Sequence, residues 1–293
     1  MYRAIRLLPV ALLLLHLFLK LFIQSNSLAL DLFLYNAIWL FAIAAITQAP
    51  LSNDPVAVAT TSLAIGFWGV GSLLNSYADF YTLSNTSQFL AQLSYVFFYP
   101  LLLVAIPRTL SRGRHLNPIE VLDSAIFGLG ISAIATAAFL SKVFPESIFD
   151  VQDQFFSLLF PVSDLLLLTL AAIAVITHRL QKRALLLFLG ILIFSASDLF
   201  YLWLSVNNSY TFGQITDDGW LIGIVVIANS FWHAQSSTTS EITIHPVFIA
   251  LSIFYQPHTS CADGATSRNL LHLYLDSNDC HPLSCFHPND DSN

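Results

Sequence analysis

Long apolar stretches, separated by short polar loops, fill the chain between residues 4 and 235. Each is close to the roughly 17 to 25 residues that a helix needs to cross a hydrocarbon core about 30 Å thick. Inside such a core every backbone N–H and C=O group must be satisfied within the protein, so only helices and closed barrels can cross it. Stretches of this length fit helices, and the sequence predicts an all-α, polytopic membrane helix bundle of about eight transmembrane helices. The expected spans are residues 4–23, 29–48, 56–75, 88–106, 119–140, 155–177, 184–206 and 218–235.

The composition supports a membrane protein. Charged residues make up 10% of the chain, against about 25% in a typical soluble domain. The formal net charge of -7 comes mainly from acidic residues after residue 235. We find no basic patch interleaved with aromatic residues, so the sequence gives no reason to expect nucleic-acid binding.

Positive charges alternate between the two sides of the expected bundle. They precede the first span and fill the loops after the fourth and sixth spans: Arg3, Arg6, Arg108, Arg112, Arg114, Arg179, Lys182 and Arg183. The opposite loops carry Lys142 among several acidic residues, which include Asp217 and Asp218. Because positively charged loops stay in the cytoplasm, we expect a protein of the cell inner (plasma) membrane with both termini cytoplasmic. The loop at residues 49–55 has no Lys or Arg, so the first hairpin has the weakest support.

Two questions of organisation stay open. Residues 1–27 can be read as a signal peptide, although His16 and Lys20 extend the segment beyond an ordinary apolar region. The domain at residues 1–235 can also be divided into two four-helix halves, 1–110 and 115–235, because residues 76–81 resemble residues 195–201. Both halves would then have the same orientation, unlike the inverted repeats of many transporters.

Residues 236–293 differ from the rest of the chain. They contain all three cysteines and are rich in Pro, Asn, Asp and Ser, so we expect a cytoplasmic tail of low order. Cys280, His281, Cys285 and His287 lie close together, but a second ligand pair for a structural zinc site is only loosely supplied by Cys261. We therefore expect no metal and no other cofactor.

Two aspartates lie inside expected spans at similar depth. Asp164 is in the span 155–177 and Asp198 in the span 184–206, and at 1.5 Å per residue both lie roughly 12 to 14 Å below the outer surface. An ionisable group there is costly and is a functional-site candidate. Pro161 can bend the first helix around a cavity, and Tyr201 shares a helical face with Asp198 and offers a hydroxyl group. We expect Asp164 and Asp198 to form one site, with a purely structural hydrogen-bonded pair as the alternative.

The expected span 119–140 contributes structural candidates. Asp123 lies near its cytoplasmic end, where a negative charge is favoured by the helix N-terminus or by neighbouring arginines. Gly128 and Gly130 give the helix a smooth face for close helix packing. A Gly-x-Gly pair with no preceding strand does not indicate a nucleotide site.

Several cofactor-binding and catalytic functions would need residues that the sequence does not supply. The only lysine inside an expected span is Lys20, near the end of the first helix, so a retinal Schiff base has no lysine deep in the bundle. A membrane haem needs facing histidines, yet His16 is the only histidine at depth. No Ser-His pair lies at matching depth either.

The same residues carry a family resemblance. Phe160-Pro161-x-x-Asp164, Asp198-Leu199-x-Tyr201, Tyr210-x-x-Gly213 and Asp217-x-x-Trp220 follow one another in an order that resembles the multi-helix sensor region of bacterial cyclic-di-GMP signalling proteins. The likeness covers roughly residues 119–235 well and the first four spans loosely. It implies a membrane sensor, normally followed by GGDEF and often EAL domains. Asp164, Asp198, Tyr201 and Trp220 are the candidate ligand-binding residues, although Trp220 also fits an interfacial aromatic belt.

This chain departs from that family because neither a Gly-Gly-Asp-Glu-Phe nor a Glu-Ala-Leu sequence is present. We therefore expect no enzymatic activity, and a non-enzymatic membrane sensory or regulatory domain that acts by pairing with itself or with other membrane signalling proteins. The change in composition near residue 236 suggests a truncated remnant from which an output domain was lost. A small-solute or ion transporter and a structural membrane scaffold are the alternatives.

Overall fold

The computed structural model describes residues 2–23, 27–50, 54–110, 130, 151–177, 181–207 and 209–233. All regular secondary structure among these residues is helical. The elements are α1 (Tyr2–Phe22), the π-helix η1 (Leu28–Leu34), α2 (Tyr35–Thr47), α3 (Pro55–Ala78), α4 (Asn85–Leu110), α6 (Val151–Thr177), α7 (Lys182–Val206) and α8 (Ile215–Ser230).

Five helical segments in the described part of the chain are long and apolar enough to cross a membrane, which indicates a multi-pass membrane protein. They are Ala4–Phe22, Leu28–Thr47, Pro55–Ala78, Asn85–Thr109 and Lys182–Ser205. Helix α6 contains a shorter apolar stretch, Leu159–Val175. The expected all-α membrane bundle is thus observed, whereas the full set of eight spans stays a prediction. Apart from Gly130, the expected span 119–140 lies outside the described residues, as does the tail 236–293.

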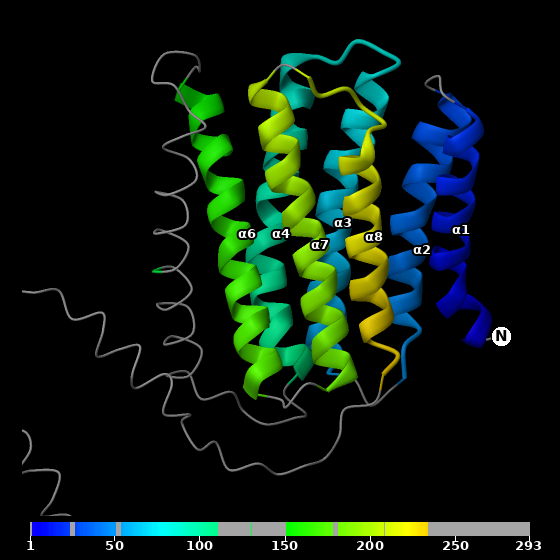
Figure 1. Cartoon of the computed structure of the whole chain (residues 1–293), viewed down its shortest axis with the longest axis vertical. Helices are drawn as coiled ribbons and strands as arrows, with labels where there is room; N and C mark the ends of the chain where they lie inside the picture. The colour runs from blue at the N-terminus through cyan, green and yellow to red at the C-terminus, as the bar shows by residue number, and fades with distance from the viewer. Residues whose placement is uncertain are drawn as a thin grey trace, which may run out of the picture. The chain divides into compact units, whose positions relative to one another are not determined.

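Helices distant in sequence lie side by side in the bundle (Figure 1). The pairs α3–α4, α7–α8 and α6–α7 are neighbours, and α4 also contacts α6 and α7. On the other side, α2 contacts α1, α3 and α8. Helix α8 therefore packs against both α7 and the first two helices, so it connects the early and late parts of the chain.

Glycines allow α7 and α8 to approach closely. A Cβ atom on Gly223 of α8 would lie 2.8 Å from the carbonyl oxygen of Gly190 on α7. A Cβ atom on Gly190 would lie 2.7 Å from Cγ1 of Ile227. Small residues at such a crossing bring two backbones together, as is common in membrane helix pairs. This contact fixes the α7–α8 pair that carries Asp198 and Trp220.

Basic residues gather at the end of the bundle where α1 begins and α8 ends. Arg6 donates hydrogen bonds to Asn229 Oδ1 at 2.9 Å and to His233 Nε2 at 3.1 Å. Arg108 forms an ion pair of 2.8 Å with Asp54, which caps the start of α3 at the same end. The structure thus places these basic groups on one side of the bundle, and the cytoplasmic identity of that side stays a prediction.

Candidate functional site

Asp164 of α6 and Asp198 of α7 meet inside the bundle, through Tyr99 of α4. The Tyr99 hydroxyl group lies 2.9 Å from Asp198 Oδ2 and 3.4 Å from Asp164 Oδ2. The single Tyr99 hydroxyl group thus contacts one oxygen atom of each carboxyl group. The two acids therefore form one coupled unit.

Two further side chains complete this unit. Ser195 donates a hydrogen bond of 3.3 Å to Asp164 Oδ1, and Trp220 Nε1 of α8 donates one of 2.7 Å to Asp198 Oδ1. Asp164 is fully buried, whereas Asp198 is half-buried. We call Tyr99, Asp164, Ser195, Asp198 and Trp220 the Asp164–Asp198 cluster. It joins side chains from α4, α6, α7 and α8 at one place.

Aromatic rings surround the cluster. Tyr99 stacks on Phe160, with ring centroids 6.0 Å apart. Trp220 contacts Trp68 at 6.4 Å and Tyr201 at 5.4 Å. These rings lower the local polarity, which strengthens each hydrogen bond and raises the cost of leaving one unmade.

The proposed contact between the Tyr201 hydroxyl group and Asp198 stays a prediction. The Tyr201 ring packs on Trp220 and Tyr210. Tyr99, which the sequence did not indicate, supplies a hydroxyl group that contacts both acids. Helical spacing along one chain segment reveals only partners on the same helix, and Tyr99 lies on another helix 65 residues before Asp164.

Of the residues predicted to have structural roles, the structure describes Pro161 and Gly130. Pro161 is buried within α6, which is helical throughout Val151–Thr177. Gly130 is helical, and a Cβ atom there would meet nothing within 4 Å. Asp123 and Gly128 lie outside the described residues.

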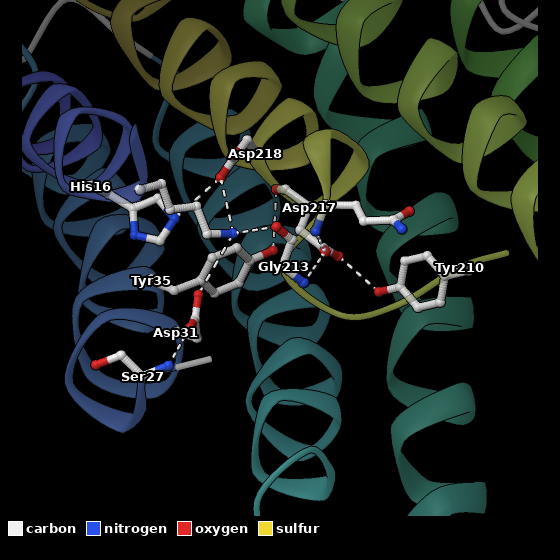
Figure 2. Close-up of polar contacts among 10 residues, drawn as sticks. His16, Ser27, Asp31, Tyr35, Tyr210, Gly213, Asp217 and Asp218 are labelled. Carbon is white, nitrogen blue, oxygen red and sulfur yellow. Dashed lines mark hydrogen bonds and ion pairs between the residues drawn. The ribbon is translucent and has the colours of Figure 1, made fainter. Parts of the chain in front are cut away.

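A second polar cluster lies at the end of the bundle where α1 ends and α8 begins (Figure 2). His16 Nε2 lies 3.1 Å from Asp218 Oδ1. Lys20 Nζ donates a 2.6 Å hydrogen bond to the carbonyl oxygen of Gly213 and lies 3.6 Å from Asp31 Oδ1 and 4.0 Å from Asp218 Oδ1. We call His16, Lys20, Asp31, Asp217 and Asp218 the Lys20 cluster.

Asp217 closes the loop before α8. Its carboxyl group accepts hydrogen bonds from the Tyr210 hydroxyl group at 2.9 Å, the Gly213 N–H at 2.6 Å and the Gln214 N–H at 2.9 Å. Gly213 has a φ of 89°, a conformation that favours glycine. Burial raises the pKa of Asp217 to about 6, against the opposing effects of these donors and of Lys20. Burial and the charge of Asp217 also raise the pKa of Tyr210.

Sequence reasoning missed the Lys20 cluster. It treated His16 as isolated and Asp217 and Asp218 as loop acids. The contacts join residues about 200 positions apart, such as His16 and Asp218, and no local spacing encodes them. The available signal was that His16 and Lys20 lie one helical turn apart in an otherwise apolar helix, followed by Asp31 in the next apolar stretch.

Aromatic contacts connect the two clusters. Tyr210, which donates to Asp217, contacts Tyr201 with ring centroids 4.6 Å apart. Tyr201 contacts Trp220 at 5.4 Å, and Trp220 donates to Asp198. A continuous set of packed side chains therefore runs from the Lys20 cluster to the Asp164–Asp198 cluster.

The described residues contain no group of three or more His, Cys, Asp or Glu side chains arranged to hold a metal ion. No protein-family model, curated protein or solved structure matches the chain.

Proposed function

We propose that the chain is a non-enzymatic membrane sensory or regulatory domain, and that the Asp164–Asp198 cluster is its sensing element. The observation that carries this proposal is the convergence of buried Asp164 from α6 and half-buried Asp198 from α7 on a hydroxyl group from α4 and an indole from α8. The resemblance of residues 119–235 to the sensor regions of cyclic-di-GMP signalling proteins agrees with it. The proposal includes eight spans, both termini cytoplasmic, and an inner-membrane location.

The physical basis is that one local event would affect four helices. Gain or loss of a proton by the two carboxyl groups, or binding of a cation between them, would change which oxygen atoms accept from Tyr99 and Trp220. Because those donors belong to α4 and α8, their hydrogen bonds would be redistributed across the bundle. A sensory element needs a stimulus that interacts more favourably with one of its two conformational states than with the other.

A structural scaffold is the second candidate, and one observation favours it. Every carboxyl oxygen atom of Asp164 and Asp198 lies within hydrogen-bond distance of a donor in the protein, from Ser195, Trp220 or the Tyr99 hydroxyl group that the two acids share. A fully satisfied buried network can serve only to fix helix packing.

Trp220 offers a direct experimental test. We would place the full chain in lipid nanodiscs and record tryptophan emission from about pH 4 to about pH 9. Subtracting the Trp220→Phe spectrum from that of the unmodified protein isolates Trp220, and Trp203→Phe, at an exposed position, is the matched control. A sensing cluster predicts a pH-dependent change in the Trp220 signal that is lost in Asp164→Asn and Asp198→Asn. A Trp220 signal that stays constant over this range, in a protein that these variants still destabilise, would support the scaffold and overturn the proposal.

A further inference from the structure

Helix α8 ends beside positive charges from two helices that it contacts, α1 and α7 (Figure 1). From α1, Arg6 donates hydrogen bonds to Asn229 Oδ1 at 2.9 Å and to His233 Nε2 at 3.1 Å. From α7, the first residue, Lys182, lies close enough to His233 for its charge to act on the imidazole ring. The end of α8 is therefore a point where cations of α1 and α7 come together.

The charges of Arg6 and Lys182 are not balanced by an acid in the described part of the chain. Neither side chain forms an ion pair with an acidic residue there. By contrast, Arg108 at the same end of the bundle is paired with Asp54 at 2.8 Å. Two unbalanced cations at one place create a positive potential that attracts an anion.

Arg6 is held in position by α8 and keeps unused hydrogen-bond donors. A guanidinium group carries five N–H donors in a planar arrangement. Arg6 uses its Nε for Asn229 and its Nη2 for His233, so its Nη1 has no hydrogen-bond partner among the described residues. A guanidinium group with free donors in a fixed plane is well suited to the oxygen atoms of a phosphate group.

Apolar surface continues from these cations along the bundle. On α7, Lys182 is followed at helical spacing by the exposed side chains of Leu185, Leu189 and Leu192, which lie on the same face. A soluble phosphate ion would have no use for this surface. A charged group followed by a long apolar strip matches the headgroup and acyl chain of a lipid.

The outward face of α8 has the same polarity. Ile222, Val226, Asn229 and His233 follow one another at helical spacing and are all partly exposed. The two apolar residues lie toward the middle of the helix, and the two polar residues lie at the end that contacts Arg6. Both α7 and α8 therefore offer a polar end and an apolar length to one bound molecule.

We propose that Arg6 and Lys182 bind the headgroup phosphate of an anionic phospholipid at the end of α8, and that its acyl chains lie along the apolar faces of α7 and α8. Basic pockets between transmembrane helices are typical sites for such headgroups. The arrangement favours an anionic headgroup over phosphatidylcholine, because the choline ammonium group would add a cation beside Arg6 and Lys182. The bound lipid would connect α1 to α7, two helices that both contact α8.

Native mass spectrometry of the full chain in detergent tests this site. The protein would be titrated with phosphatidylglycerol and, separately, with phosphatidylcholine, and the affinity for the first bound lipid compared. Arg6→Gln and Lys182→Gln should each weaken phosphatidylglycerol binding about fivefold and leave phosphatidylcholine binding unchanged. Lys182→Arg, which keeps the charge at an exposed position, should bind as the unmodified protein does. Arg108→Gln is the matched control, because it removes one positive charge at the same end from a residue that already has an acidic partner.

Three results would overturn the proposal. The first is equal affinity of the unmodified protein for the two lipids. The second is a loss of phosphatidylglycerol binding in Arg108→Gln as large as in Arg6→Gln and Lys182→Gln, since general attraction to a positive surface would then explain the binding. The third is displacement of phosphatidylglycerol by millimolar inorganic phosphate, which would indicate a site for soluble phosphate in place of a lipid site.

Discussion

Replacing either acid of the Asp164–Asp198 cluster by asparagine should reveal a strong coupling between them. Asparagine has nearly the same shape as aspartate, but one of its two acceptor atoms becomes a donor. In Asp198→Asn, the new amide group can face either Tyr99 or Trp220, and both of these donate to the present carboxyl group at 2.9 and 2.7 Å. One donor is then left without an acceptor at a buried site, which costs about 1 to 3 kcal/mol.

Asp164→Asn should have a cost of the same order, because Tyr99 and Ser195 donate to its two oxygen atoms. In the double variant, the loss of the shared Tyr99 contact is counted once, whereas the two single variants together count it twice. The double variant should therefore cost less than the sum of the singles by more than about 0.5 kcal/mol, the limit within which independent sites add.

The assay is a double-mutant cycle of unfolding free energy in mixed detergent micelles. The matched control pairs Asp164→Asn with Asp54→Asn, since Asp54 binds Arg108 at the basic end of the bundle and shares no partner with Asp164. This control cycle should be additive. If the Asp164–Asp198 cycle were equally additive, the two acids would face separate neighbours, and the shared hydrogen-bond unit would be refuted.

Three further predictions follow from the described contacts. Tyr99→Phe should destabilise the protein by about 1 to 3 kcal/mol, since it removes the bridging hydroxyl group, while Tyr201→Phe should cost less; equal losses in thermal unfolding would contradict the assignment of Tyr99 as the bridge. Gly223→Ala should destabilise by about 1 to 3 kcal/mol, because its Cβ atom would lie 2.8 Å from the carbonyl oxygen of Gly190. Gly66→Ala, whose nearest neighbour would be Ile43 at 3.8 Å, should be neutral or stabilising in the same assay. Finally, because the folded-state pKa of Asp217 is raised from 3.8 to about 6, the folded chain binds this proton more tightly than the unfolded chain. The stability of the unmodified protein relative to Asp217→Asn should therefore be greatest below about pH 4 and fall by up to about 3 kcal/mol as the pH rises to about 6; a relative stability that rises over this interval would refute the sign.

The bundle was predictable from the sequence because its signal is local. Apolar length identifies each span without knowledge of its neighbours, and the described helices begin and end within a few residues of the expected positions in most cases. The similar depth of Asp164 and Asp198 could also be calculated, because a regular helix rises by a constant amount per residue. Their meeting in the structure depends in addition on α6 and α7 being adjacent, which a short connecting loop favours.

The other contacts of the two clusters could not be predicted because they join residues that are distant in sequence. Tyr99 bridges the two acids from α4, and only the packing of α4 against α6 and α7 brings it there. The Lys20 cluster depends on α1 lying beside α8, the first and last helices of the described bundle. The sequence assigned Asp217 to a loop because Asp217 precedes the apolar stretch of α8. The helix itself already starts at Ile215. Its role as a capping residue is not marked by the usual Ser or Thr, since Gln214 occupies that position.

The π-helix η1 has a consequence for the register of the second span. A π-helical turn closes i→i+5 hydrogen bonds and so accommodates a longer loop of backbone than an α-helical turn. Deleting one residue within Leu28–Leu34 would allow a continuous α-helix, but it would turn the segment before the deletion by about 100° relative to α2. Asp31 would then face away from Lys20, or α2 would lose the fit of Trp39 against Gly69. The extra residue lets two surfaces on one span, one polar and one apolar, each face their own partner.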